Sequence, residues 1–126
     1  MKNINIEKTA SSPAIILDEK LGLIELRGKC YPENTFEFYK PIQSWVEGYI
    51  DHAGHNGTTI NIGLTYFNSA TSQCIFELLE VFSKATLTDV AVNWLYHEDN
   101  DHSYDNYEDY TEDFPNLNIQ AIVIEH

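Results

Sequence analysis

The stretch that decides the fold is residues 57–84, GTTINIGLTYFNSATSQCIFELLEVFSK. In its first part, the apolar residues Ile60, Ile62 and Leu64 alternate with residues that are small or polar. This two-residue period predicts a β-strand. In its last part, apolar residues recur at helical spacing and form one stripe, made of Cys74, Ile75, Leu78, Leu79 and Phe82. The pattern predicts a strand that leads directly into an amphipathic helix.

The turn between this strand and helix reads Asn68-Ser69-Ala70-Thr71, in which three of four residues carry polar side chains typical of helix starts. In open α/β sheets, turns at the carboxyl ends of strands often carry function. A phosphate on a hydroxyl here would face free helix amides and the positive end of the helix dipole. We interpret the turn as a candidate phosphorylation site. From the residues alone, an ordinary helix cap is the more frequent explanation.

The remaining sequence predicts the other elements in order. Strands are expected over residues 3–9, 14–18 and 21–30, with a hairpin turn at 18–21. A helix should begin at Asn34 or Thr35 and run to residue 50, with Pro41 either kinking it or marking the first turn of its main part. Strands over 90–95 and 117–124 flank residues 97–113, where a short tyrosine-lined helix or an ordered loop is expected. The chain is predicted to fold as one α/β domain, residues 1–126, with a mixed β-sheet packed against helices.

Composition narrows the class of function. The chain has 126 residues and a formal net charge of −13, from 20 acidic and 7 basic residues. Because phosphate contacts need clustered Lys and Arg, this charge argues against binding nucleic acid or an anionic membrane surface. It favours a protein partner that presents a basic patch. With two cysteines, no signal peptide and no apolar run near 18 residues, we expect a cytoplasmic protein with reduced thiols.

The run at residues 98–113 holds eight acids and no Lys or Arg. As a calcium loop it fails, because Tyr104 stands where glycine is required and Tyr110 where the final glutamate is required. A solvated acidic surface, which could serve as a docking patch, is the preferred interpretation. The rival is a metal-binding or hydrolytic domain that uses this run together with His97 or His102.

Motifs for catalysis are not found in the sequence. It contains no GxSxG elbow, no P-loop and no GxGxxG fingerprint. Carboxylates are so frequent that a pair of them carries no information. We therefore expect no catalytic residues, no cofactor and no bound metal.

Four segments together resemble a known family. They are residues 28–34 (GKCYPEN), residues 39–41 (YKP) with Trp45, residues 66–69 (YFNS), and residues 93–96 (NWLY) followed by acids. In this order they are similar to the SiaC-type bacterial regulatory phosphoproteins, which are small single domains with a STAS-like fold. The resemblance spans nearly the whole chain, and it implies a partner-switching protein without catalysis of its own.

The resemblance implies three partners. A dedicated serine/threonine protein kinase phosphorylates a hydroxyl in the turn, and a metal-dependent protein phosphatase removes the phosphate. The unphosphorylated form binds and activates a diguanylate cyclase, which raises cyclic di-GMP and favours biofilm or aggregation. An alternative of the same class is a STAS-type antagonist of an anti-sigma factor.

By position, the family's acceptor threonine corresponds to Ser69. The family reads Asn-Thr-Ser-Ser where this chain reads Asn-Ser-Ala-Thr, so Thr71 stays open as the alternative acceptor. Neighbours that support the turn are expected to be Tyr66, Phe67, Asn68 and Ala70. The segment Tyr31, Pro32, Glu33 and Asn34 is a candidate partner interface, and exposed aromatics such as Tyr31, Phe36 and Tyr66 would belong to it.

Overall fold

The computed structural model describes residues 2–52, 57–85, 87 and 89–125. Its elements follow the predicted order, and the third helix, which the sequence left open, is present. In chain order they are β1 (Ile4–Ile6), β2 (Ala14–Asp18), β3 (Leu23–Cys30), α1 (Thr35–Asp51), β4 (Thr58–Phe67), α2 (Ser69–Lys84), β5 (Val90–His97), α3 (Asp101–Asp113) and β6 (Asn118–Ile124). The predicted mixed α/β fold is confirmed.

Strands β1 and β3 are shorter than predicted, because the turn after β1 begins earlier and the turn before β3 ends later than expected. β1 ends at Ile6, and the Thr9 hydroxyl accepts hydrogen bonds from the backbone N–H groups of Ser11 (3.2 Å) and Ser12 (3.0 Å). β3 begins only at Leu23, because the preceding turn ends at Gly22, whose φ of 62° lies in the left-handed region. Side-chain and backbone turn chemistry therefore sets these ends.

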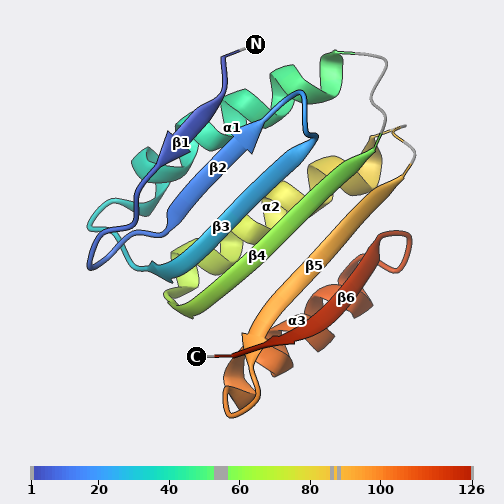
Figure 1. Cartoon of the computed structure of the whole chain (residues 1–126). Coiled ribbons are helices and arrows are strands. Elements are labelled where there is room, and N and C mark those ends of the chain that lie inside the picture. The colour runs from blue at the N-terminus through green and yellow to red at the C-terminus, as the bar shows by residue number, and fades with distance from the viewer. Residues whose placement is uncertain (1, 53–56, 86, 88, 126) are drawn as a thin grey trace.

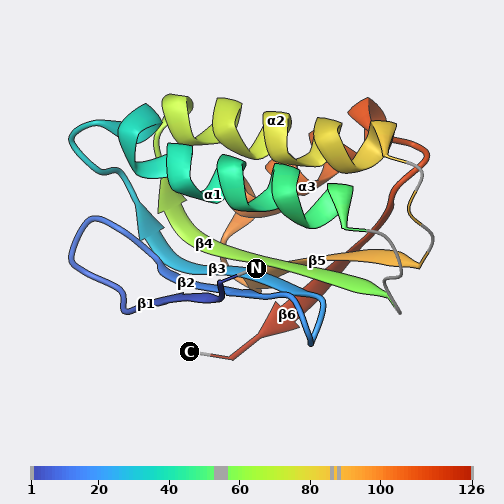
Figure 2. The same ribbon diagram turned by 90° about the horizontal axis from the view of Figure 1, so that it is seen from above.

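The six strands form one sheet whose spatial order is the sequence order, β1-β2-β3-β4-β5-β6. The pairs β1–β2 and β2–β3 are antiparallel, whereas β3–β4, β4–β5 and β5–β6 are parallel. Each parallel connection crosses through one helix. Because the crossovers all advance in the same direction and share one hand, the three helices lie on the same face of the sheet, as Figures 1 and 2 show.

The hydrophobic core lies between the helix layer and the sheet. The alternation predicted for β4 is confirmed, since Ile60, Ile62 and Leu64 are at most 2% exposed. From the helices, the stripe of α2 and the apolar face of α1 close the core, with Trp45 stacked on Tyr49 at 5.2 Å between ring centroids. This burial against tertiary neighbours is what holds the two helices in place.

On the face that the helices leave open, a polar row crosses three strands. The Asn61 amide donates to Glu25 Oε1 at 3.1 Å, and the Asn93 amide donates to Asn61 Oδ1 at 2.9 Å. These residues are in register on β3, β4 and β5. The row satisfies half-buried polar groups and fixes strand register.

Helix α1 begins at Thr35 with Asn34 as its N-cap, and it continues through Pro41 to Asp51. Pro41 therefore lies two turns inside the helix, and the idea that it marks a first turn is wrong. Its ring removes the backbone donor that would reach Glu37. No helix within the described ranges combines the length and apolarity needed to cross a membrane.

Candidate functional site

The three helices begin at the carboxyl ends of three adjacent parallel strands, so their amino ends meet at one edge of the sheet (Figure 1). Each begins with an asparagine: Asn34 for α1, Asn68 for α2 and Asn100 for α3. In each case the side-chain oxygen accepts a hydrogen bond from the backbone N–H three residues later, at 3.2, 2.8 and 3.1 Å respectively. This edge therefore gathers capped helix ends, where the partial charge is positive.

Two of these asparagines also link neighbouring elements. The Asn68 amide donates to the Thr35 hydroxyl at 3.4 Å, which joins the first turns of α2 and α1. The Asn100 amide donates to the carbonyl oxygen of Thr65 at 3.2 Å, which joins α3 to the end of β4. The turn before α2 is thus held from both sides. From the sequence, Thr35 was considered only as a possible helix start and Asn100 was not singled out, although asparagine at successive helix starts was a usable signal.

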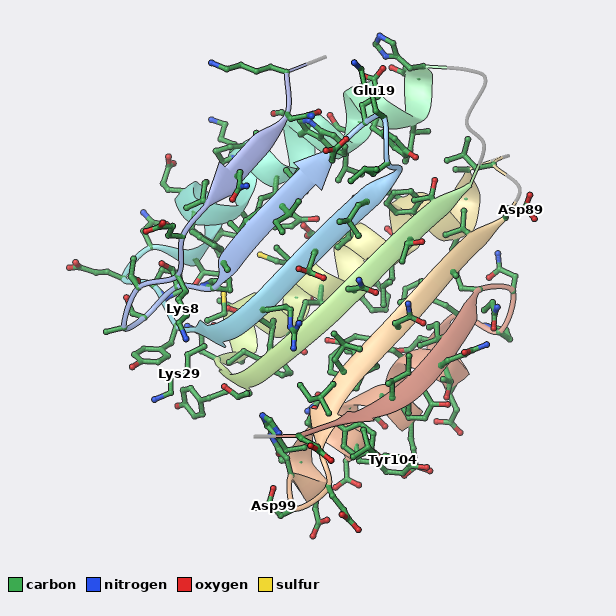
Figure 3. The ribbon with its side chains drawn as sticks, in the orientation of Figure 1. Lys8, Glu19, Lys29, Asp89, Asp99 and Tyr104 are labelled. Carbon is green, nitrogen blue, oxygen red and sulfur yellow. The ribbon has the colours of Figure 1, made fainter. Side chains whose placement is uncertain are left out.

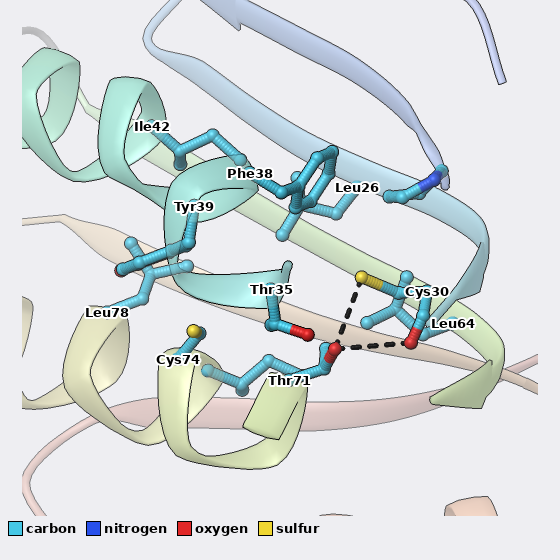
Figure 4. Close-up of a pocket in the computed structure, with 12 residues that line it drawn as sticks. Leu26, Cys30, Thr35, Phe38, Tyr39, Ile42, Leu64, Thr71, Cys74 and Leu78 are labelled. Atoms are coloured by element: carbon cyan, nitrogen blue, oxygen red, sulfur yellow. Dashed lines mark hydrogen bonds between the residues drawn. The ribbon is translucent and has the colours of Figure 1, made fainter. Parts of the chain in front are cut away.

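The two candidate acceptor hydroxyls occupy opposite environments. Ser69 is the first residue of α2 and its side chain is exposed. Thr71 is only 4% exposed, and its hydroxyl donates to the carbonyl oxygen of Cys30 at 3.1 Å and lies 3.4 Å from Cys30 Sγ (Figure 4). A kinase can reach the first hydroxyl without disturbing the fold. It can reach the second only if the start of α2 opens.

Cys30 anchors the turn to the sheet. Its carbonyl oxygen accepts from the Asn68 backbone N–H at 3.3 Å as well as from the Thr71 hydroxyl. Burial raises the pKa of the Cys30 thiol, and the hydrogen bond to Thr71 offsets this only in part. The thiol is therefore protonated near neutral pH and is not a nucleophile. Cys74 lies in the core as predicted, and burial raises its pKa to about 11.

Beneath the turn lies a small cavity between α1, α2 and the sheet. It is lined in part by Cys30, Thr35, Thr71 and Cys74, and its volume is about 20 Å³ (Figure 4). A cavity of this size holds about one water molecule, whereas ligand pockets measure roughly 300–1,000 Å³. The turn therefore rests on closely packed side chains, and a partner or ligand must bind it from the solvent side.

Exposed aromatic side chains flank the turn. Tyr66, at 58% exposure, and Tyr31, at 39%, meet edge to face with ring centroids 5.3 Å apart. The Tyr31 hydroxyl donates to the carbonyl oxygen of Ala10 at 2.9 Å, which fixes its ring. Phe36, in the first turn of α1, is 60% exposed. Lys29 pairs in register with Tyr66 and lies at the same edge (Figure 3).

Some of the remaining predicted site residues lie on the surface, and others pack against the turn. Glu33 and Asn34 are exposed, and Pro32 and Ala70 are half-buried. Phe67 is half-buried and lies 6.3 Å from Trp94 between ring centroids, so it supports the turn from below. The structure brings the segments 31–34 and 66–71 together at one edge because β3 and β4 are parallel neighbours.

The acidic run forms α3 and the turn before it. Across the described residues, no three His, Cys, Asp or Glu side chains are placed to hold a metal ion. His97 Nδ1 lies 3.1 Å from the carbonyl oxygen of Ile124, and the His102 ring packs 6.4 Å from that of Phe67. Within the described residues, the rival metal-binding interpretation therefore has no ligand set.

Comparison with known proteins shows the family. The model of the SiaC family regulatory phosphoproteins matches residues 6–124. This chain belongs to the SiaC family. A curated relative, an uncharacterized protein of Pseudomonas aeruginosa (strain UCBPP-PA14), is 29% identical over 125 residues, which cover 96% of this chain and 98% of the relative.

Solved structures of SiaC from Pseudomonas aeruginosa share the fold. Apo-SiaC superposes with a TM-score of 0.84 at 24% identity, covering 96% of this chain and 98% of that one. A further structure of SiaC gives 0.85 at 25% identity, covering 97% and 100%. A chain in the crystal structure of the diguanylate cyclase SiaD in complex with its activator SiaC gives 0.88 at 24% identity, covering 96% and 99%. The predicted family is confirmed.

Proposed function

We propose that this SiaC family member is a non-catalytic switch protein that binds and activates a diguanylate cyclase in its unphosphorylated form. Phosphorylation of Ser69 blocks that binding. The family match and the SiaC structure solved with a cyclase support the partner class. A cognate serine/threonine kinase adds the phosphate and a metal-dependent phosphatase removes it. The cycle operates in the cytoplasm and sets the level of cyclic di-GMP.

The observation that carries this proposal is the contrast between the two hydroxyls of the turn. Ser69 is exposed at the first position of α2, whereas the Thr71 hydroxyl is buried and bound to Cys30. A kinase must fit its substrate hydroxyl into its own active site. Only an exposed side chain on a fixed turn meets that demand without unfolding, which supports Ser69 over Thr71 as the acceptor.

Electrostatics explains why such a phosphate acts as a switch. It adds about −1.5 to −2 charges and three acceptor oxygens. Asn68 already accepts from the Thr71 backbone N–H, but the N–H groups of Ser69 and Ala70 in the first turn of α2 have no intrahelical acceptor, so they can hold a phosphate on Ser69 and the fold tolerates it. A partner packed on Tyr31 and Tyr66 would have to desolvate a dianion in the interface. That cost weakens binding without any large change in conformation.

Labelling of single-residue variants tests the acceptor. We expect the cognate kinase to phosphorylate the parent protein and the Thr71→Val variant, and to leave Ser69→Ala unmodified. Ser44→Ala, which removes an exposed hydroxyl from α1, is the matched control and should be labelled like the parent. Intact mass and phosphopeptide mapping give the readout. Full labelling of Ser69→Ala at Thr71 would overturn the assignment.

A further inference from the structure

A second, partly exposed surface lies on α3, β5 and β6, apart from the turn at residues 68–71, which we call the switch turn after its proposed function. This second surface consists of the exposed Tyr104 and Val123 and the half-buried Tyr96 and Tyr107, and we call these four residues the tyrosine surface. Ring centroids are 5.4 Å apart both between Tyr96 and Tyr104 and between Tyr104 and Tyr107. Val123 pairs in register with Tyr96 and is 52% exposed, and Tyr104 is 38% exposed. Figure 3 shows Tyr104 beside β6.

Carboxylates surround these rings. An open depression is lined by Tyr96 and Tyr104 together with Glu98, Asp101 and Asp105. A second one continues along α3 over Asp105, Glu108, Asp109, Thr111 and Glu112. In the described part of the chain, no Lys or Arg lies within ion-pair distance of Asp101, Asp105 or Glu108, and the Lys84–Glu80 pair is on α2. The negative charge of Glu108 is also the main cause of a raised pKa for Tyr104.

This arrangement is unfavourable for an isolated helix. Four pairs of acids stand four residues apart on α3: Asp101–Asp105, Asp105–Asp109, Glu108–Glu112 and Asp109–Asp113. Like charges at this spacing repel, and acids in the last turn also face the negative end of the helix dipole. A cationic ligand would relieve both effects. Large exposed aromatic and aliphatic side chains gathered on one surface are typical of protein-binding sites.

We propose that the tyrosine surface is a docking surface for an arginine-containing basic segment of a protein partner. Arginine satisfies both halves of the surface, because its planar guanidinium stacks on tyrosine rings and forms two parallel hydrogen bonds with a carboxylate. Lysine offers the same charge without that geometry. The acids exclude a nucleic acid ligand, whose phosphates they would repel.

Peptide binding tests the location of this surface. The probe is a fluorescein-labelled octa-arginine peptide, titrated with the full chain and followed by fluorescence anisotropy. The double variant Asp105→Asn, Glu108→Gln removes two exposed charges from the surface and should weaken binding about fivefold. The control Glu47→Gln, Asp51→Asn removes the same charge from exposed positions on α1 and should stay within about twofold of the parent. Equal weakening by both variants would overturn the proposal in favour of net charge alone.

A second comparison tests the role of the rings. The parent protein should bind octa-arginine about threefold or more tightly than octa-lysine, because stacking on tyrosine favours guanidinium. Tyr104→Leu keeps an apolar side chain and all carboxylates, and it should remove this preference while octa-lysine binding stays unchanged. If the parent shows no preference for arginine, or if Tyr104→Leu retains it, the tyrosines take no part and the proposal fails. Neither experiment depends on the state of Ser69.

Discussion

At the scale of single residues, the switch turn separates two hydroxyls that look alike in the sequence. Ser69 and Thr71 are two positions apart on α2, which places their side chains about 200° apart around the helix axis. One therefore faces solvent when the other faces the sheet. The inward hydroxyl ties α2 to Cys30, and the outward one is open to modification. The opposite orientations of the two hydroxyls follow from helix geometry.

Replacing Thr71 with valine should destabilise the fold while leaving the acceptor intact. The change keeps the side-chain volume and removes the hydrogen bond to the Cys30 carbonyl oxygen, which still accepts from Asn68. We expect a loss of about 1 kcal/mol in the free energy of unfolding, measured by urea titration. Ser69→Ala, at an exposed position, should change it by less than about 0.5 kcal/mol. Equal stability of the two variants would show that the Thr71 bond does not hold the turn.

At the scale of elements, three asparagine caps organise the functional edge. Asn34, Asn68 and Asn100 each cap one helix, but Asn68 also reaches the Thr35 hydroxyl on α1. The turn is therefore fixed before any partner arrives. A preformed binding edge avoids the cost of ordering a loop on association.

The double role of Asn68 predicts a difference between cap variants. Asn34→Ala removes one cap and should lower the free energy of unfolding by about 1 kcal/mol. Asn68→Ala removes a cap and the bond to Thr35, so the loss should approach about 2 kcal/mol. Urea unfolding of both variants measures the difference. A smaller loss for Asn68→Ala than for Asn34→Ala would argue against its linking role.

Helices and strands could be predicted from the sequence better than tertiary contacts could. The strand and helix of residues 57–84 could be predicted because their apolar periods are clear, and the asparagine caps follow from residue type. The sequence left residues 97–113 open between a helix and a loop, because six of the 13 residues of α3 are acidic. Helix α3 is held by a tertiary contact, in which the Trp94 ring N–H donates to the Ser103 carbonyl oxygen at 3.0 Å. The burial of Thr71 depends on Cys30, which lies 41 residues away in the chain. A contact between residues so far apart in the chain leaves no local pattern in the sequence.

At the scale of the whole molecule, the core holds thiol and phenol groups in their neutral forms. Burial raises the pKa of Cys74 from 9.0 to about 11, and it also raises those of Tyr39 and Tyr110. A group whose pKa is raised in the folded state favours folding only while it stays protonated. The contribution of these groups to stability should therefore be fully present well below pH 9 and be lost as the pH rises through 9 toward 11, because the unfolded chain releases these protons first.

Urea unfolding at pH 8 and pH 10.5 measures this fall. Cys74→Ala removes one of the responsible groups, so its stability should fall less steeply over the same interval than that of the parent protein. Ser44→Ala, which replaces an exposed group without a titrating proton, should follow the parent. If the parent protein were equally stable at pH 8 and pH 10.5, the buried thiol and phenols would not control its stability at alkaline pH.

The whole molecule presents two surfaces with different chemistry. In the proposed function the aromatic edge around Ser69 binds the cyclase and a phosphate repels it, whereas the acidic tyrosine surface on α3, β5 and β6 is proposed to bind a basic segment. Both are formed by side chains on a rigid sheet and helix framework. The proposed switch requires a change of charge and no rearrangement of the fold.

In the proposed function, a phosphate on Ser69 controls binding of a diguanylate cyclase. The most direct test is to install phosphoserine at position 69 during synthesis and to titrate the modified and unmodified proteins against the cyclase of the same organism by calorimetry. We predict that the unmodified protein binds and that phosphoserine weakens the affinity at least about tenfold, by leaving a dianion to be desolvated in the interface. Equal affinities for the two forms would contradict the account.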